Sequence, residues 1–69
     1  MNYTEDLWNF LEMLRKNLES FRNTPNINHS RIRGLMLEAS EGFYRSFHMN
    51  NRPLMAGFDE IFREADKLL

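Results

Sequence analysis

Two histidines and a few hydroxyl side chains are the residues of this 69-residue chain that could support acid–base or nucleophilic catalysis. His29 could act as a general base, and Ser30 or Ser40 could act as a nucleophile. Such chemistry needs the base within hydrogen-bond reach of the proton that it removes, and a partner that orients the base. Nothing in the spacing of these residues provides that arrangement. We therefore expect no enzyme active site.

The acidic pair Glu38 and Glu41 supplies half of the carboxylate ligands that a metal site between helices would use. No Glu-x-x-His pair accompanies it, and the chain contains no cysteine. The ligand set is too small for the metal centres that helical bundles hold. We expect neither a metal nor another cofactor.

Basic residues gather in the sequence on either side of the first predicted turn. Arg22, His29, Arg31 and Arg33 would share one end of an antiparallel bundle with Lys67, around the positive end of the second predicted helix. Guanidinium groups bind phosphate and carboxylate in a bidentate manner, so this cluster is a candidate anion site. The alternative is that these residues form ordinary salt bridges at the surface. The net charge of −1 ranks nucleic acid or nucleotide binding below protein binding.

Three helices must position all of these side chains. Two turn-forming stretches, residues 23–28 and 50–53, combine asparagine with proline and divide the chain. Helical periodicity fills the segments between them, which predicts an all-α protein with helices at about 3–22, 29–49 and 53–68. Asn2, together with either Asn28 or Ser30, is expected to cap the first two helices, and Pro53 is expected to occupy the first position of the third.

Apolar residues repeat with alternating spacings of four and three in the first and third segments, which is typical of helices packed lengthwise, and the second segment has a stripe of its own with helical spacing. The expected core stripes are Leu7, Leu11, Leu14, Leu18 and Phe21 in the first helix, Ile32, Leu35, Met36, Ala39, Phe43 and Phe47 in the second, and Leu54, Phe58, Ile61, Ala65 and Leu68 in the third. The second helix also carries Gly34 and Gly42. Because glycine destabilises a helix interior, we expect another backbone to approach closely at both.

The simplest fold is an up-down-up antiparallel bundle of three helices, in a single domain over residues 1–69. The alternative is a helical hairpin whose third helix packs on a partner chain. A chain of this length has a marginal core, and it lacks the cysteines that could reinforce it, so we expect a homo-oligomer.

No run of about 18 apolar residues occurs, and the first residues are acidic where a secretory signal would be basic. We expect no association with membranes and a cytoplasmic location.

Several large apolar residues lie outside the expected core stripes: Trp8, Met13, Leu37, Tyr44 and Met49. Aromatic residues and methionine are enriched at protein interfaces, yet a small core could also use every one of them. Both readings are open for these residues. Our leading hypothesis is a small non-enzymatic protein that regulates or inhibits a protein partner, with Trp8, Met13, Leu37 and Tyr44 making contact. The alternative is a regulatory or sequestering module for a phosphate-bearing ligand or nucleic acid, using Arg22, His29, Arg31 and Arg33.

Overall fold

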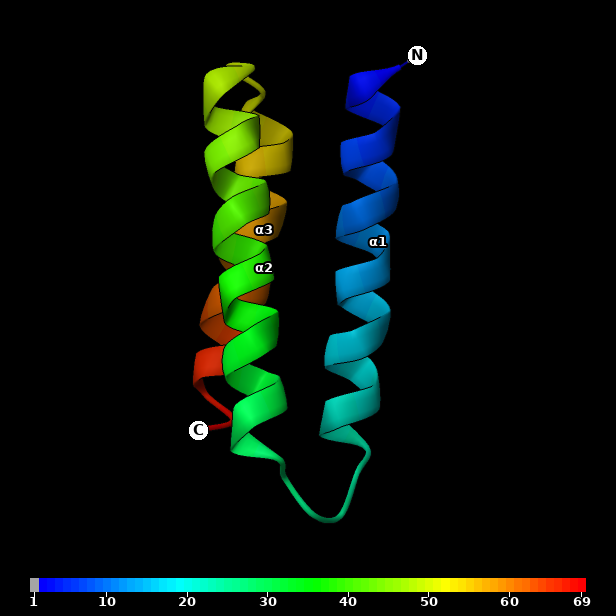
Figure 1. Ribbon diagram of the computed structural model, residues 1–69, viewed down its shortest axis with the longest axis vertical. Helices are drawn as coiled ribbons and strands as arrows, with labels where there is room; N and C mark the ends of the chain where they lie inside the picture. Colours follow the sequence, from blue (N-terminus) through cyan, green and yellow to red (C-terminus); the bar gives the residue numbers. More distant parts are fainter. Residues whose placement is uncertain (1) are drawn as a thin grey trace.

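Three helices form an antiparallel bundle in a computed structural model that describes residues 2–69 (Figure 1). They are α1 (Tyr3–Arg22), α2 (His29–His48) and α3 (Arg52–Asp66). The chain runs down through α1, up through α2 and down through α3, and its principal extents are 38 × 18 × 16 Å. The predicted all-α class and the up-down-up order are therefore confirmed.

An asparagine caps the start of each helix. The side-chain oxygens of Asn2, Asn28 and Asn51 each accept a hydrogen bond from the backbone N–H three residues later, at 3.0, 3.2 and 3.1 Å respectively. Each bond satisfies one of the N–H groups that a helix leaves unpaired in its first turn. The third helix consequently begins at Arg52, one residue earlier than expected, and Pro53 follows within its first turn. Asn51, and not the proline, sets this boundary.

The connection between α2 and α3 is a tight turn built on asparagine. Asn50 has φ of 53°, a left-handed conformation that asparagine tolerates better than most residues. Its N–H donates to the carbonyl of Phe47 at 2.9 Å, and the N–H of Asn51 donates to the carbonyl of Ser46 at 3.0 Å. These two hydrogen bonds end α2 at His48, and the chain reverses direction immediately after them. The two helices are therefore antiparallel neighbours.

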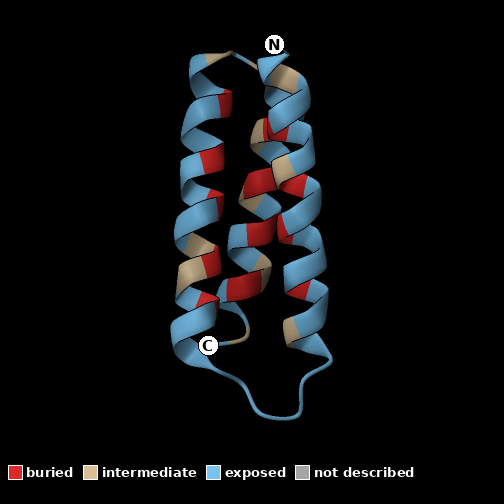
Figure 2. Cartoon of the chain, turned by 45° about the vertical axis from the view of Figure 1, so that its right-hand side comes forward, coloured by how far each residue is buried: buried red, intermediate tan, exposed pale blue. Residues whose placement is uncertain are grey.

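The core is a single apolar cluster on the inward faces of all three helices (Figure 2). The stripes predicted for the first and third helices are buried almost completely, with Phe21 and Leu68 half-buried at the ends. The buried apolar residues are Leu7, Leu11, Leu14 and Leu18 of α1, Ile32, Leu35 and Ala39 of α2, and Leu54, Phe58, Ile61 and Ala65 of α3. Because α3 packs on both other helices of its own chain, the predicted three-helix bundle is confirmed, and the alternative of a two-helix hairpin is wrong.

The stripe predicted for the second helix is partly wrong. Phe43 and Phe47 point away from the core, and the inward positions beside them belong to Gly42 and Ser46, which are buried. The reason is a close approach between helices: a Cβ at Gly42 would overlap the ring of Phe58. The ring fills the space that a large side chain of α2 would otherwise occupy. The hydroxyl of Ser46 donates to the carbonyl of Gly42 at 2.7 Å, so its burial leaves no unpaired polar atom.

The sequence predicts that another backbone approaches both glycines of α2, but the group that lies against Gly42 is the ring of Phe58, and Gly34 has no close neighbour. A Cβ at Gly34 would meet no atom within 4 Å. A third glycine, Gly57 of α3, does lie at a close contact, because a Cβ there would be 2.5 Å from a methyl group of Leu11. The two glycines at close contacts thus allow α3 to approach α2 and α1 respectively.

Candidate protein-interaction surface

Exposed apolar side chains concentrate on the outer side of α2 and the adjoining edge of α3. We call this surface the α2–α3 face, and its members are Met36, Leu37, Phe43, Tyr44, Phe47 and Phe62. Leu37, Tyr44 and Phe47 are 72%, 62% and 59% exposed. Helical geometry brings the five α2 residues onto one side, since their spacings of three, four and seven repeat along the helix. Exposure of this many large apolar groups in one place marks an interaction surface more often than it occurs by chance.

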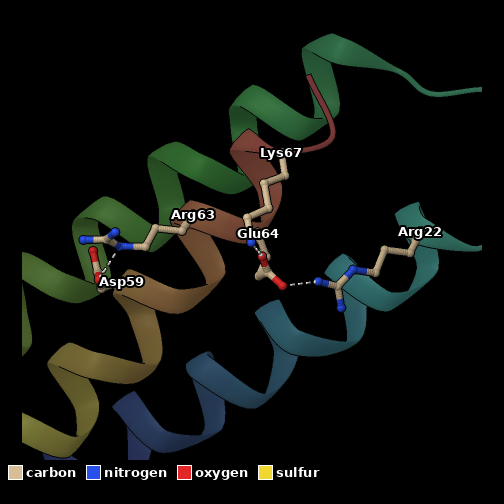
Figure 3. A network of polar contacts seen from close by, with 5 residues as sticks. All are labelled: Arg22, Asp59, Arg63, Glu64 and Lys67. Carbon is tan, nitrogen blue, oxygen red and sulfur yellow. Dashed lines mark hydrogen bonds and ion pairs between the residues drawn. The ribbon is translucent and has the colours of Figure 1, made fainter.

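Two shallow hollows make the α2–α3 face continuous. One is lined by Ser40 and Phe43 of α2 and by Asp59 and Phe62 of α3, with Ala39 and Phe58 at its floor. The other is lined by Arg33, Met36, Leu37 and Phe62. Phe62 borders both hollows, so they adjoin at the junction of the two helices, and we refer to them together as the groove of the α2–α3 face. Asp59 at the edge of this groove is paired with Arg63, whose Nε lies 2.8 Å from its carboxylate (Figure 3).

Aromatic contacts order the end of the α2–α3 face near the turn. The ring of His48 meets the ring of Tyr44 edge-on, with centroids 4.4 Å apart, and the ring of Phe47 at 5.9 Å. Such edge-to-face contacts favour defined ring orientations over free rotation. Two of the most exposed rings on the face, Tyr44 and Phe47, therefore both contact the ring of His48.

The four side chains predicted to bind a partner occupy three different places. Leu37 and Tyr44 lie on the α2–α3 face. Trp8 and Met13 are 40% and 46% exposed and lie on opposite sides of α1. Trp8 shares a helix side with Arg15, which lines the groove between α1 and α3, and Met13 shares a side with Phe10 in the groove between α1 and α2. Met49, the fifth residue outside the predicted stripes, packs half-buried against the core.

Three phenylalanines of the α2–α3 face are absent from the predicted contact residues: Phe43 and Phe47, which the sequence pattern places in the core stripe of the second helix, and Phe62. The signal that could have identified the first two is the small residue directly before each one. Gly42 and Ser46 are spaced by four, as core positions are, and small side chains there indicate a helix crossing. The neighbouring phenylalanines must then lie to one side of the crossing.

The basic end of the bundle is organised around a carboxylate. One oxygen of Glu64 accepts from Arg22 of α1 at 2.9 Å, and the other lies 2.8 Å from the ammonium group of Lys67 (Figure 3). Arg22 also lies 4.0 Å from Glu19. The hydrogen bond and the charge of Lys67 are the main causes that lower the pKa of Glu64. Desolvation opposes them, and the charge and hydrogen bond of Arg22 add smaller effects that also lower this pKa. Two of the gathered cations are therefore already neutralised by an acidic neighbour.

The other candidate anion-binding residues are spread over the start of α2. His29 is the exposed first residue of the helix. Arg31 lines a hollow at the α1–α2 connection together with Ser20, Thr24 and Asn28. Arg33 lies instead beside Leu37 and Phe62 on the α2–α3 face. The structure thus brings Arg22 together with Lys67, and places Arg33 on a different surface.

The candidates for chemistry also lie apart. Ser40 lines the groove of the α2–α3 face, whereas Ser30 is exposed at the start of α2. Glu41 pairs with Arg45 at 2.6 Å, and Glu38 lies near them at the α1–α2 groove. Within residues 2–69, no group of three or more histidine and acidic side chains could hold a metal ion. None of the helices in this part of the chain combines the length and apolar character needed to cross a bilayer.

No protein-family model matches the chain, and no curated protein or solved structure is similar enough to count as a match. The fold is a three-helix bundle, and the α2–α3 face is the most distinctive feature of its surface.

Proposed function

We propose that the chain is a small, non-enzymatic, cytoplasmic interaction protein that self-associates and regulates or inhibits a protein partner. The observation that carries this proposal is the α2–α3 face. Five of its six apolar residues are exposed, and each aromatic side chain has about 150–250 Å² of surface to bury. With their exposed fractions, the apolar area of this face is roughly 500 Å², at the upper end of what a single patch on a monomeric protein shows.

The composition of the face also suits protein recognition. Tyrosine and phenylalanine provide large contact areas with few rotatable bonds, and Met36 adapts its shape to a neighbour. Arg33 and Asp59 stand at the edges of the groove, where charged residues contribute specificity and orientation. A central apolar area with charged residues around it is the usual anatomy of an interface between proteins.

Trp8 and Met13 give α1 a separate contribution to binding. Both are large and partly exposed, and they belong to a helix that contributes no residue to the α2–α3 face. A partner protein that contacts α1 would leave the α2–α3 face free for self-association. We propose this division of surfaces between a second copy of the chain and the regulated partner.

The experiment that tests this function compares assemblies in the source cells. Tagged wild-type protein and the variants Tyr44→Ala and Trp8→Ala would be isolated gently, and native mass spectrometry would give the mass of each complex. We expect the wild-type assembly to exceed the 8.3 kDa of one chain, and each variant to lose a component while keeping its helical circular dichroism. Helix loss in both variants, or assemblies identical to the wild type, would overturn the proposal.

A second proposal is binding of a phosphate-bearing ligand or nucleic acid through the arginines. The hollow that Arg31 lines beside the N-terminus of α2 favours it, because Thr24 and Asn28 also border this hollow, although apolar side chains such as Ile27 form part of its lining. It ranks second, because Arg22 is paired with Glu64 and Arg33 lies on the α2–α3 face. Binding of a labelled oligonucleotide that weakens with added salt and with Arg31→Ala would support it, and binding insensitive to both would exclude it.

A further inference from the structure

We propose that the α2–α3 face binds a second copy of this chain, with the two α2 helices antiparallel about a two-fold axis close to residue 42. This inference rests on the self-association included in the proposed function. It specifies which surface the two copies share and in which register. The observations that carry it are the spacing of the exposed residues on α2, the alternation of their sizes, and the area that they offer.

The outer side of α2 carries a second heptad pattern in addition to the one that faces the core. Its positions are Arg33, Leu37, Ser40, Tyr44 and Phe47, with spacings of four, three, four and three. This is the repeat that lets one helix insert its side chains between those of another. Ile32, Leu35 and Ala39 already satisfy the core of the same helix. Residues of the outer repeat are therefore left exposed by the helices of their own chain and are available to a further helix.

The residues of this outer repeat complement themselves when two copies run antiparallel. In the proposed register Leu37 lies opposite Phe47 of the second copy, and Ser40 lies opposite its Tyr44. The two-fold axis repeats both pairs, so four layers of opposed side chains lie along the contact between the two α2 helices. A small side chain meets a large one at the two inner layers, so the helices can approach without leaving cavities. A shift of one heptad would oppose fewer apolar residues.

The flank of α2 that borders α3 closes one side of this seam. A two-fold axis perpendicular to both α2 helices puts the α3 flanks of the two copies on the same side. Phe43 then lies beside the Phe43 of the second copy close to the axis, with Phe62 of each α3 behind it. On the opposite flank Glu41 also approaches the axis, and its pairing with Arg45 offsets the repulsion between the two carboxylates.

The available area suits a dimer of a chain this small. A typical stable interface buries about 800 Å² on each partner. The apolar groups of the α2–α3 face contribute roughly 500 Å² of that by their size and exposure. The charged and polar residues around it, including Arg33, Ser40 and Asp59, lie where they would supply the rim.

Cysteine cross-linking tests the register directly, because the natural chain contains no cysteine. The purified full chain would be prepared as two single variants, Leu37→Cys and Phe47→Cys, and oxidised separately and as a mixture. We expect a disulfide-linked heterodimer in the mixture and little product from either variant alone. In this register two copies of residue 37 are ten positions apart, about 15 Å along the helix. A disulfide needs Cα atoms within about 7 Å.

A matched control and a mass measurement distinguish the possible failures. Ser20→Cys, on the exposed side of α1, should stay uncross-linked under the same conditions. Strong homodimer formation by Leu37→Cys would indicate parallel helices and overturn this inference, while self-association through the face would stand. A dimeric mass with no cross-link in the mixture would also overturn the register alone. A mass of 8.3 kDa at every concentration would remove the self-association on which the inference rests.

The strength of the contact gives an additional measurement. Leu37→Glu puts a charge into the proposed seam at a site that is 72% exposed in the single chain, so the variant should fold normally. We expect its dimer dissociation constant to rise by roughly 30-fold or more, the change associated with an important interface residue. An unchanged constant would contradict the proposed seam. If the charge disturbs α2, Leu37→Gln provides the same comparison without it.

Discussion

The ring of Phe58 in α3 packs directly over Gly42 in α2, where no other side chain would fit. This contact draws the two helices together and turns Phe43 outward. The buried core and the exposed α2–α3 face are therefore consequences of the same helix crossing. The first prediction follows from the two glycines of α2.

Gly42→Ala and Gly34→Ala should change stability in opposite directions. A methyl group at residue 42 overlaps the Phe58 ring, so we expect a loss of about 1–3 kcal/mol in the free energy of unfolding. A methyl group at residue 34 meets nothing within 4 Å and improves helix propensity, for a gain of up to about 1 kcal/mol. Urea denaturation of both variants measures this. Equal effects at the two positions would contradict the described packing.

The asparagine caps should contribute measurably to stability. Asn28→Ala removes the side-chain oxygen that accepts the N–H of Arg31, and we expect it to destabilise the fold by about 1 kcal/mol. Asn26→Ala, in the exposed connection before α2, is the matched control and should change stability by less than about 0.5 kcal/mol. Thermal denaturation compares them. Equal losses would show that the cap at residue 28 has no special role.

Alanine substitutions at Leu11 and Tyr44 should differ in their effect on stability, because the first residue lies in the core and the second on the surface. Leu11 is fully buried, so Leu11→Ala should cost about 2–5 kcal/mol of stability in the folded chain. Tyr44→Ala should cost far less at concentrations where the protein is monomeric, because the ring is 62% exposed. Chemical denaturation at low concentration makes the comparison. A large loss for Tyr44→Ala in the monomer would place this ring in the core and remove it from the α2–α3 face.

The ion pairs of Glu64 predict a dependence of stability on pH. Lys67 and Arg22 hold the pKa of Glu64 below its ordinary value of 4.5 in the folded chain. The folded state therefore gains stability from this group above about pH 4.5, and loses it as pH falls through the lowered pKa. Glu64→Gln should weaken this loss, as measured by unfolding free energies across the acidic range. If the unfolding free energies of the wild type and Glu64→Gln changed with pH in the same way, the ion pairs of Glu64 would not be the cause of the pH dependence.

Much of the fold could be predicted from the sequence, because periodicity and turn residues act locally. Leu7 and Leu18 mark the buried side of α1 by spacing alone, and Asn28 identifies its helix start. The position of Phe47 could not be predicted in this way. A spacing of four from Phe43 fits the core side and the neighbouring side of α2 almost equally well, and the choice depends on Phe58 of another helix.

The candidate surface was predicted in part. Leu37 and Tyr44 are identified by the sequence because they lie outside the core stripe of α2, and the structure adds Phe43, Phe47 and Phe62 around them. Trp8 and Met13 also lie outside a core stripe, but they belong to α1. Grouping residues into one surface requires the tertiary arrangement, which the pattern within a single helix does not contain.

Self-association through the α2–α3 face is tested most simply by the mass of the purified protein in solution. Sedimentation equilibrium would compare the wild type with Phe47→Glu, whose substitution lies on the α2–α3 face at an exposed position. We expect the wild-type mass to approach twice 8.3 kDa as concentration rises, and the folded variant to stay at 8.3 kDa. A wild type that remains at 8.3 kDa throughout, or a variant that associates equally well, would contradict it.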